Sequence, residues 1–206
     1  MKRFSLFGIL FLGLSLLFLS SRYRASIGEF RIDPSSEFRL EGVTNINRFS
    51  CECLESFPVD TYEIISSPLP YILKLNNTDL HLPTEKLDCG RKGINNDLRK
   101  ALKADAYPYI RIEVESIRLP DTPNGLPDDR WSVLPVKTHI TIAGTRKPLH
   151  LSVRAKALGD HSYQLQSETK VAMSEFGIDP PRPLLGMIKV DDVITIHLDL
   201  KVKLSV

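Results

Sequence analysis

Residues 193–206 read VITIHLDLKVKLSV, an unbroken alternation of apolar and polar side chains that reaches the last position of the chain. Successive side chains of a β-strand point to opposite faces, so this period of two predicts a long strand with one apolar and one polar face. An open edge on so long a strand invites aggregation, and both of its edges are therefore expected to be paired. This favours a sheet that closes on itself.

Shorter alternating runs occupy residues 38–41, 49–53, 109–117, 138–143 and 149–157. Turn-forming residues separate the runs at Gly42 and at 76–77, 124–125, 144–145 and 159–160. The pattern predicts an all-β, antiparallel fold of about eight strands, with a barrel as the favoured architecture. An open β-sandwich remains an alternative, because alternation does not fix connectivity.

One helix is expected between the strands. Asn95, Asn96 and Asp97 are good capping residues, and apolar residues follow at helical spacing up to Lys103. We expect this short helix to cover one end of the barrel.

The first 25 residues have the features of a secretory signal. A basic start, Met1 to Arg3, precedes an almost wholly apolar run from Phe4 to Leu19. An uncleaved anchor is the alternative.

The whole chain has 27 basic and 25 acidic residues. Removal of residues 1–25, which hold four basic residues and no acid, leaves 23 basic and 25 acidic residues, a net charge of −2. No basic stripe with interleaved aromatic residues remains, so nucleic acid is not an expected partner.

Three cysteines, Cys51, Cys53 and Cys89, make a disulfide the natural expectation for an exported chain. Cys51 and Cys53 lie on the same face of one strand and are poorly placed to bond each other, so Cys89 is expected to pair with one of them. Buried thiols are the alternative. A Cys-x-Cys pair with one distant cysteine is an incomplete zinc set, and no metal is predicted.

The sequence contains no pattern that indicates catalysis. The five histidines are scattered, and His139, His150 and His197 fall in the polar phase of their strands, where solvent exposure is expected. The adjacent carboxylates at 128–129 and 191–192 suit turns better than a catalytic pair. We therefore predict no enzyme, no catalytic residues and no cofactor.

The order of several short motifs resembles the YceI-like family. The stretches that carry the resemblance are LEGVTNINRFSC at 40–51, LDCG at 87–90, DLRKALK at 97–103, YPYI at 107–110, ITIAGT at 140–145, MSEFGIDPP at 173–181 and GMIKV at 186–190. The resemblance covers residues 28–206. Departures from the family pattern are Val43 in place of the usual Ser, the extra Cys53 and a longer loop at 119–131.

The resemblance implies an extended, lipocalin-like antiparallel barrel of eight strands with one short helix. It further implies an exported, periplasmic or secreted protein that holds a long isoprenoid or lipid chain, such as an isoprenoid quinone, in its lumen. The expected partner is thus a lipid or isoprenoid small molecule, while peripheral membrane contact and a homodimer are left open.

The inward faces of the predicted strands give the candidate ligand-binding residues. They are Phe38, Leu40, Phe49, Ile110, Ile112, Val114, Ile140, Ile142, Leu151, Val153, Ile196, Leu198 and Leu200. These are mostly mid-sized aliphatic side chains, which suit a flexible hydrocarbon chain. Two alternatives keep the same alternation: a barrel filled by its own side chains, and an outer-membrane barrel with its apolar face outward.

Overall fold

The computed structural model describes residues 24–53, 60–66, 72–76, 78–120, 126–127 and 129–205. The expected signal segment therefore lies almost wholly outside the described residues, as do Asn77, Asp128 and the turn expected at 124–125. The first strand begins at Arg24, so the last two residues of that segment, 24 and 25, lie in it.

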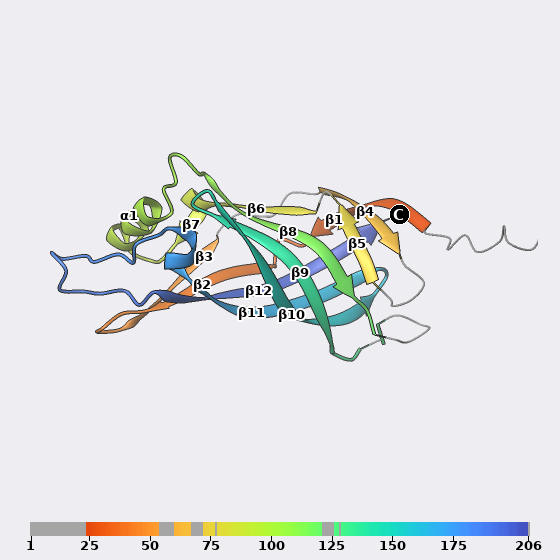
Figure 1. The fold of residues 1–206 in the computed structure, drawn as a ribbon. Coiled ribbons are helices and arrows are strands. Elements are labelled where there is room, and N and C mark those ends of the chain that lie inside the picture. Colours follow the sequence, from red (N-terminus) through yellow and green to blue (C-terminus); the bar gives the residue numbers. More distant parts are fainter. Residues whose placement is uncertain are drawn as a thin grey trace, which may run out of the picture.

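The described residues form one antiparallel sheet of 12 strands, which confirms the predicted all-β fold (Figure 1). Eight of them pair in a circuit that returns to its start, because β1 pairs with both β4 and β12. In circuit order these are β1 (Arg24–Ile32), β4 (Asp60–Ser66), β5 (Ile72–Asn76), β8 (Tyr109–Arg118), β9 (Ser132–Ile142), β10 (Thr145–Gly159), β11 (Ser162–Ala172) and β12 (Val193–Ser205).

The other end of the barrel is built differently. There β12 pairs with β2 (Glu37–Val43) instead of β1, and the sheet continues through β3 (Arg48–Cys53) to β7 (Leu87–Asp88). On the far side, β6 (Asp79–Pro83) pairs with β8, and the short helix η1 (Thr84–Lys86) leads from β6 to β7. Among the described residues no ladder joins β7 to β6, and helix α1 (Lys92–Ala101) lies at this end (Figure 1).

The alternation predicted for the final strand is confirmed, since β12 runs from Val193 to Ser205. On it Ile196 is buried, whereas Lys201 and Lys203 are exposed. Apolar side chains therefore point inward and charged ones outward, the reverse of the arrangement that an outer-membrane barrel needs.

Two hairpins are closed by residues with positive φ. Ala143 and Gly144, at φ 48° and 81°, join β9 to β10, and Asp160 and His161, at 47° and 54°, join β10 to β11. Two central residues with positive φ match the twist of the flanking strands. Both turns lie within one residue of the predicted positions, but the turn predicted at Gly42 is wrong, because Gly42 lies inside β2.

Two buried clusters fill the interior. The larger lies toward α1 and includes Phe38, Leu82 and Ile140. The smaller consists of Leu134, Val136, Leu151 and Ala155 on β9 and β10. Within the described part of the chain, no helix is long and apolar enough to cross a membrane.

Candidate functional site

A cavity of about 420 Å³ lies between α1 and the open end of the barrel. We call it the end cavity. Its walls come from β2 and β3, from α1, from the ends of β8, β9, β11 and β12, from the short helix η2 (Met173–Phe176), and from the irregular segment 178–190. Most of the side chains in these walls are aliphatic or aromatic.

The end cavity brings together five of the thirteen lumen candidates: Leu40, Phe49, Ile110, Ile142 and Ile196. The remaining candidates lie in the two interior clusters. Phe38, Ile112 and Ile140 are buried in the larger cluster, with Leu198 and Leu200 packed against it. Leu151 is buried in the smaller cluster, with Val114 and Val153 packed against it.

Sequence reasoning missed more than half of the apolar lining. The missed residues are Ile46, Cys51, Ile94, Leu98, Ala101, Leu102, Val171, Met173, Phe176, Ile178, Pro181, Pro183, Leu184, Ile188, Val190 and Ile194. Leu98, Ala101 and Leu102 could have been found, because they form the apolar stripe of the predicted helix. The residues from 173 to 190 lie in short turns and irregular backbone, where no periodic signal exists.

The disulfide that fixes the base of α1 joins Cys51 on β3 to Cys89, immediately after β7. This confirms the expected bridge to Cys89 and selects Cys51 as its partner. Cys53, at the end of β3, is not disulfide-bonded. The bridge therefore ties the segment that leads into α1 to the strand that lines the end cavity.

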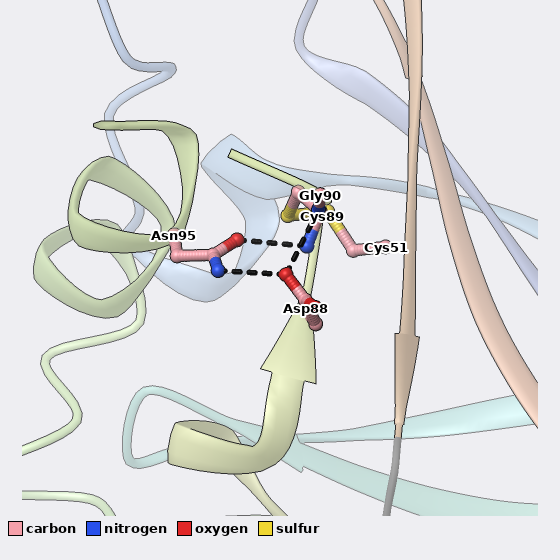
Figure 2. Close-up of a disulfide and its surroundings, with 5 residues drawn as sticks. All are labelled: Cys51, Asp88, Cys89, Gly90 and Asn95. Carbon is pink, nitrogen blue, oxygen red and sulfur yellow. Dashed lines mark hydrogen bonds between the residues drawn. A yellow bond between two sulfur atoms is a disulfide. The ribbon is translucent and has the colours of Figure 1, made fainter. Parts of the chain in front are cut away.

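The expected capping role of the asparagines is wrong. Helix α1 begins at Lys92 after Arg91, which makes no side-chain cap, so Asn95 lies inside the helix. Its side chain instead accepts a hydrogen bond from the Cys89 backbone N–H at 2.7 Å and donates one to the Asp88 carboxylate at 2.8 Å (Figure 2). Asn95 thus anchors α1 to the disulfide.

The hydrogen bonds to Asp88 also set its titration. The Asn95 amide and the Gly90 backbone N–H, both donating at 2.8 Å, hold the pKa of this carboxyl below its usual value. Because these bonds favour the charged form, an ionised Asp88 strengthens the attachment of α1.

A close approach of ring to backbone shapes the cavity wall at β2. A Cβ atom at Gly42 would stand 2.3 Å from Cζ of Phe49, the residue paired with it across β2 and β3. The Phe49 ring can therefore cover the strand and reach the end cavity only because residue 42 has no side chain.

Segment 178–190 is held against the β2–β3 turn. Asn45 accepts a hydrogen bond from the Lys189 N–H at 2.8 Å and donates one to the Met187 carbonyl at 3.0 Å. Its own backbone N–H donates to the Lys189 carbonyl at 3.1 Å. Figure 1 shows the two segments projecting together beyond β2 and β12.

The polar groups around this end have structural partners. Asp192 accepts hydrogen bonds from the hydroxyl of Ser174 at 2.5 Å and from its backbone N–H at 2.8 Å, which lower the pKa of Asp192 and hold the start of η2 beside β12. This is the turn role predicted for the 191–192 pair. His197 lies in the polar phase of β12 as expected, but it is half-buried, with Nε2 3.3 Å from the Glu41 carboxylate, and is less exposed than a solvated surface position.

The rim of the end cavity is polar. Glu41, Thr44, Asn47, Arg91 and Asp97 line it beside the apolar residues. Chemically, the site offers a long apolar surface with a few hydrogen-bonding and charged groups near the protein surface. That arrangement suits an amphipathic molecule with a hydrocarbon tail.

The circuit of strands, the helix over one end and the apolar end cavity define an antiparallel barrel with an apolar cavity at one end. The YceI-like domain model matches residues 70–202. The chain therefore belongs to the YceI-like family, as its motifs indicated. No curated protein sequence matches the chain significantly.

Solved structures show the same fold at low sequence identity. BcnA of Burkholderia cenocepacia is 15% identical, with a TM-score of 0.60 over 82% of this chain and 98% of that one. A polyisoprenoid-binding domain from Saccharophagus degradans, described as implicated in plant cell wall breakdown, is 10% identical, with a TM-score of 0.63 over 84% and 97%. A mutant Campylobacter jejuni YceI protein is 14% identical, with a TM-score of 0.50 over 98% and 97%.

Proposed function

We propose that the protein is an exported binding protein that holds a long isoprenoid or lipid chain, as a carrier or store and without catalysis. The hydrocarbon tail of this ligand occupies the end cavity, and the ligand's polar group lies at the rim. The observation that carries this proposal is the end cavity itself. Its volume of about 420 Å³ falls within the roughly 300–1,000 Å³ of typical ligand sites.

The energetics of an apolar chain support the proposal. One isoprene unit buries roughly 70–80 Å² of apolar surface, which at ~25 cal/mol per Å² stabilises the complex by about 2 kcal/mol. A few units therefore give firm binding without any hydrogen bond to the tail. At the rim, the Arg91 guanidinium supplies donors that a quinone carbonyl or a phosphate oxygen can accept.

The relatives support the same class of ligand. The domain from Saccharophagus degradans is named for polyisoprenoid binding, and this chain shares the YceI-like domain. Export is supported by the basic and apolar start of the chain and by the Cys51–Cys89 bridge, since disulfides persist in oxidising compartments.

A barrel packed by its own side chains is the second candidate, and one observation favours it. Leu134, Val136, Leu151 and Ala155 are buried together in the interior, on β9 and β10. If that packing extends through the barrel, the hydrocarbon tail of the ligand is confined to the end cavity. If the barrel holds no ligand at all, the protein has a structural role.

Native mass spectrometry of the exported protein, followed by organic extraction, tests the proposal. We expect a species heavier than the polypeptide by one lipid or isoprenoid, released on denaturation and recovered in the organic phase. The same spectrum reports whether the protein is a dimer. Polypeptide mass alone, from cells and after incubation with an isoprenoid quinone, would favour the packed barrel.

A further inference from the structure

Four large apolar side chains project into solvent at the mouth of the end cavity. Ile46 lies in the β2–β3 turn, and Leu184, Leu185 and Met187 lie in segment 178–190; their exposed fractions are 65%, 62%, 104% and 70%. We call these four residues the apolar tip. Contiguous exposed apolar side chains of this size are uncommon on soluble proteins and mark surfaces that bind something.

The tip is built so that its leucines point outward. Leu184 and Leu185 both adopt positive φ, at 52° and 55°, before Gly186 at 85°. The turn is closed by its own backbone, with the Met187 N–H donating to the Leu184 carbonyl at 3.1 Å. The Asn45 side chain then fixes this turn against Ile46's hairpin through Met187 and Lys189. Two segments distant in sequence thus form one projection (Figure 1).

The segments that carry the tip, and the start of α1, hold five exposed basic residues. Arg182 and Lys189 flank it in its own segment, Arg48 follows Ile46, and Arg91 and Lys92 stand at the start of α1, all exposed. The stretches 42–48, 90–96 and 180–190 contain no acidic residue. The nearest acids in sequence are Glu41 and Asp97, which line the cavity, Asp88, which bonds Asn95, and Asp179 and Asp191, which bound the segment.

We propose that the apolar tip docks this end of the barrel on a bilayer that contains anionic phospholipids. Apolar side chains enter the boundary between head groups and acyl chains, while the surrounding basic residues attract the anionic surface. The tip is continuous with the end cavity, because Ile46 and Leu184 also line it. Docking therefore places the cavity mouth at the membrane, where a hydrophobic chain enters without crossing water. Entry of a ligand from the membrane rests on the proposed function, whereas docking itself is measured without any ligand.

Vesicle sedimentation of the protein, purified in the form in which it accumulates in cells, tests the docking. The probe is vesicles of phosphatidylglycerol and phosphatidylethanolamine in roughly a one-to-three ratio, compared with vesicles of phosphatidylcholine alone. Replacing both leucines, by Leu184→Ser with Leu185→Ser, is expected to weaken partitioning by about 10-fold per leucine. Arg182→Gln with Lys189→Gln is expected to weaken it by about fivefold per charge, only on anionic vesicles and less at high salt.

Val133→Ser is the matched control, because Val133 is exposed on β9 at the other end of the barrel and its loss should leave partitioning unchanged. Unchanged partitioning of the double leucine variant, or no partitioning of the wild type, would overturn the inference. So would a dimer in sedimentation velocity that the leucine variant abolishes, since the tip would then bind a second copy. If lipid is extracted from the protein but the protein does not bind vesicles, the docking inference alone is wrong. If the protein binds vesicles but no ligand is ever recovered from it, the result counts against the proposed function instead.

Discussion

Filling the end cavity should remove the ligand without unfolding the barrel, and Ile94→Trp is the change that tests this. Ile94 projects from α1 into the end cavity and is not among the half-buried side chains packed against the larger core cluster. Its indole would therefore enter space that a ligand tail otherwise occupies. Each isoprene unit that it displaces removes about 2 kcal/mol of apolar burial, or about 30-fold in affinity.

The stability of this variant should change little, because the ring fills space instead of displacing packed neighbours. Leu198→Trp makes the matched comparison, since Leu198 packs against the larger cluster without lining the cavity. Overpacking there should cost about 1–3 kcal/mol, and each kcal/mol lowers the Tm of a chain of this size by roughly 2–4 °C.

The assay combines native mass spectrometry with a thermal melt for both variants. We expect Ile94→Trp to keep its Tm and lose bound mass, and Leu198→Trp to lose Tm first. Bound mass retained at wild-type stoichiometry in Ile94→Trp would refute the assignment of the ligand to the end cavity. A large drop in Tm for Ile94→Trp would show that the cavity is packed more tightly than its volume indicates.

Three further predictions concern stability. The disulfide closes a loop over a sequence separation of 38 residues, and its reduction should destabilise the fold by about 4 kcal/mol in the chain-entropy model. The control variant Cys53→Ser should show the same loss on reduction. Thiol titration of the denatured, unreduced protein should find one thiol instead of three. The lowered pKa of Asp88 means that its carboxylate stabilises the fold above the unfolded value of about 3.9, and that this contribution is lost as the pH falls through the folded pKa. Asp88→Asn should thus flatten the acid side of a Tm-versus-pH curve, and an unchanged acid slope would count against the anchor. Gly42→Ala should destabilise the fold, because its Cβ would meet the Phe49 ring, by about 1–3 kcal/mol in urea melts. Gly93→Ala, in open space on α1, should instead stabilise it by about 0.5–1 kcal/mol.

The strands that the sequence predicted are those whose inward positions are almost all apolar, with Thr138 on β9 as a buried exception. On β12 the inward positions carry only Ile, Leu and Val, and the predicted limits agree with the structure to within one residue. Strand β8 likewise begins at Tyr109 as expected and ends one residue later, at Arg118. In such strands the pattern depends only on which face is buried, so tertiary context adds little information.

Strand β11 escaped notice for a specific reason. Its register places Ser167 opposite Leu198 and Thr169 opposite Ile196, so two polar side chains occupy inward positions. Its outward glutamines, Gln164 and Gln166, donate hydrogen bonds to Asp199 on β12 at 2.8 Å. Because both faces carry polar residues, the sequence of β11 shows no alternation of apolar and polar side chains. The outward glutamines have their hydrogen-bond partner on the neighbouring strand, which the sequence alone does not reveal.

The helix was predicted for a reason that proved only half correct. Its apolar stripe, Leu98 and Ala101, faces the barrel as expected, but Asn95 was assigned to a cap on residue type alone. Whether an asparagine caps its own helix or bonds a different element depends on what lies beside it in space. Here Cys89 and Asp88 lie within hydrogen-bonding distance, and no local rule could reveal that.

The periodic and irregular parts of this chain therefore encode different properties. Alternating strands determine the barrel and most of its burial, so substitutions at positions such as Ile140 should change stability first. The end cavity takes much of its lining from α1, η2 and segment 178–190, which are held by a few anchors such as Asn45 and Asn95. Because those anchors contribute little to the barrel core, their loss should loosen the cavity wall more than the fold. Asn45→Ala should accordingly reduce bound mass in native spectra while the strand signal in circular dichroism persists. Loss of both signals together would mean that barrel and cavity form a single cooperative unit.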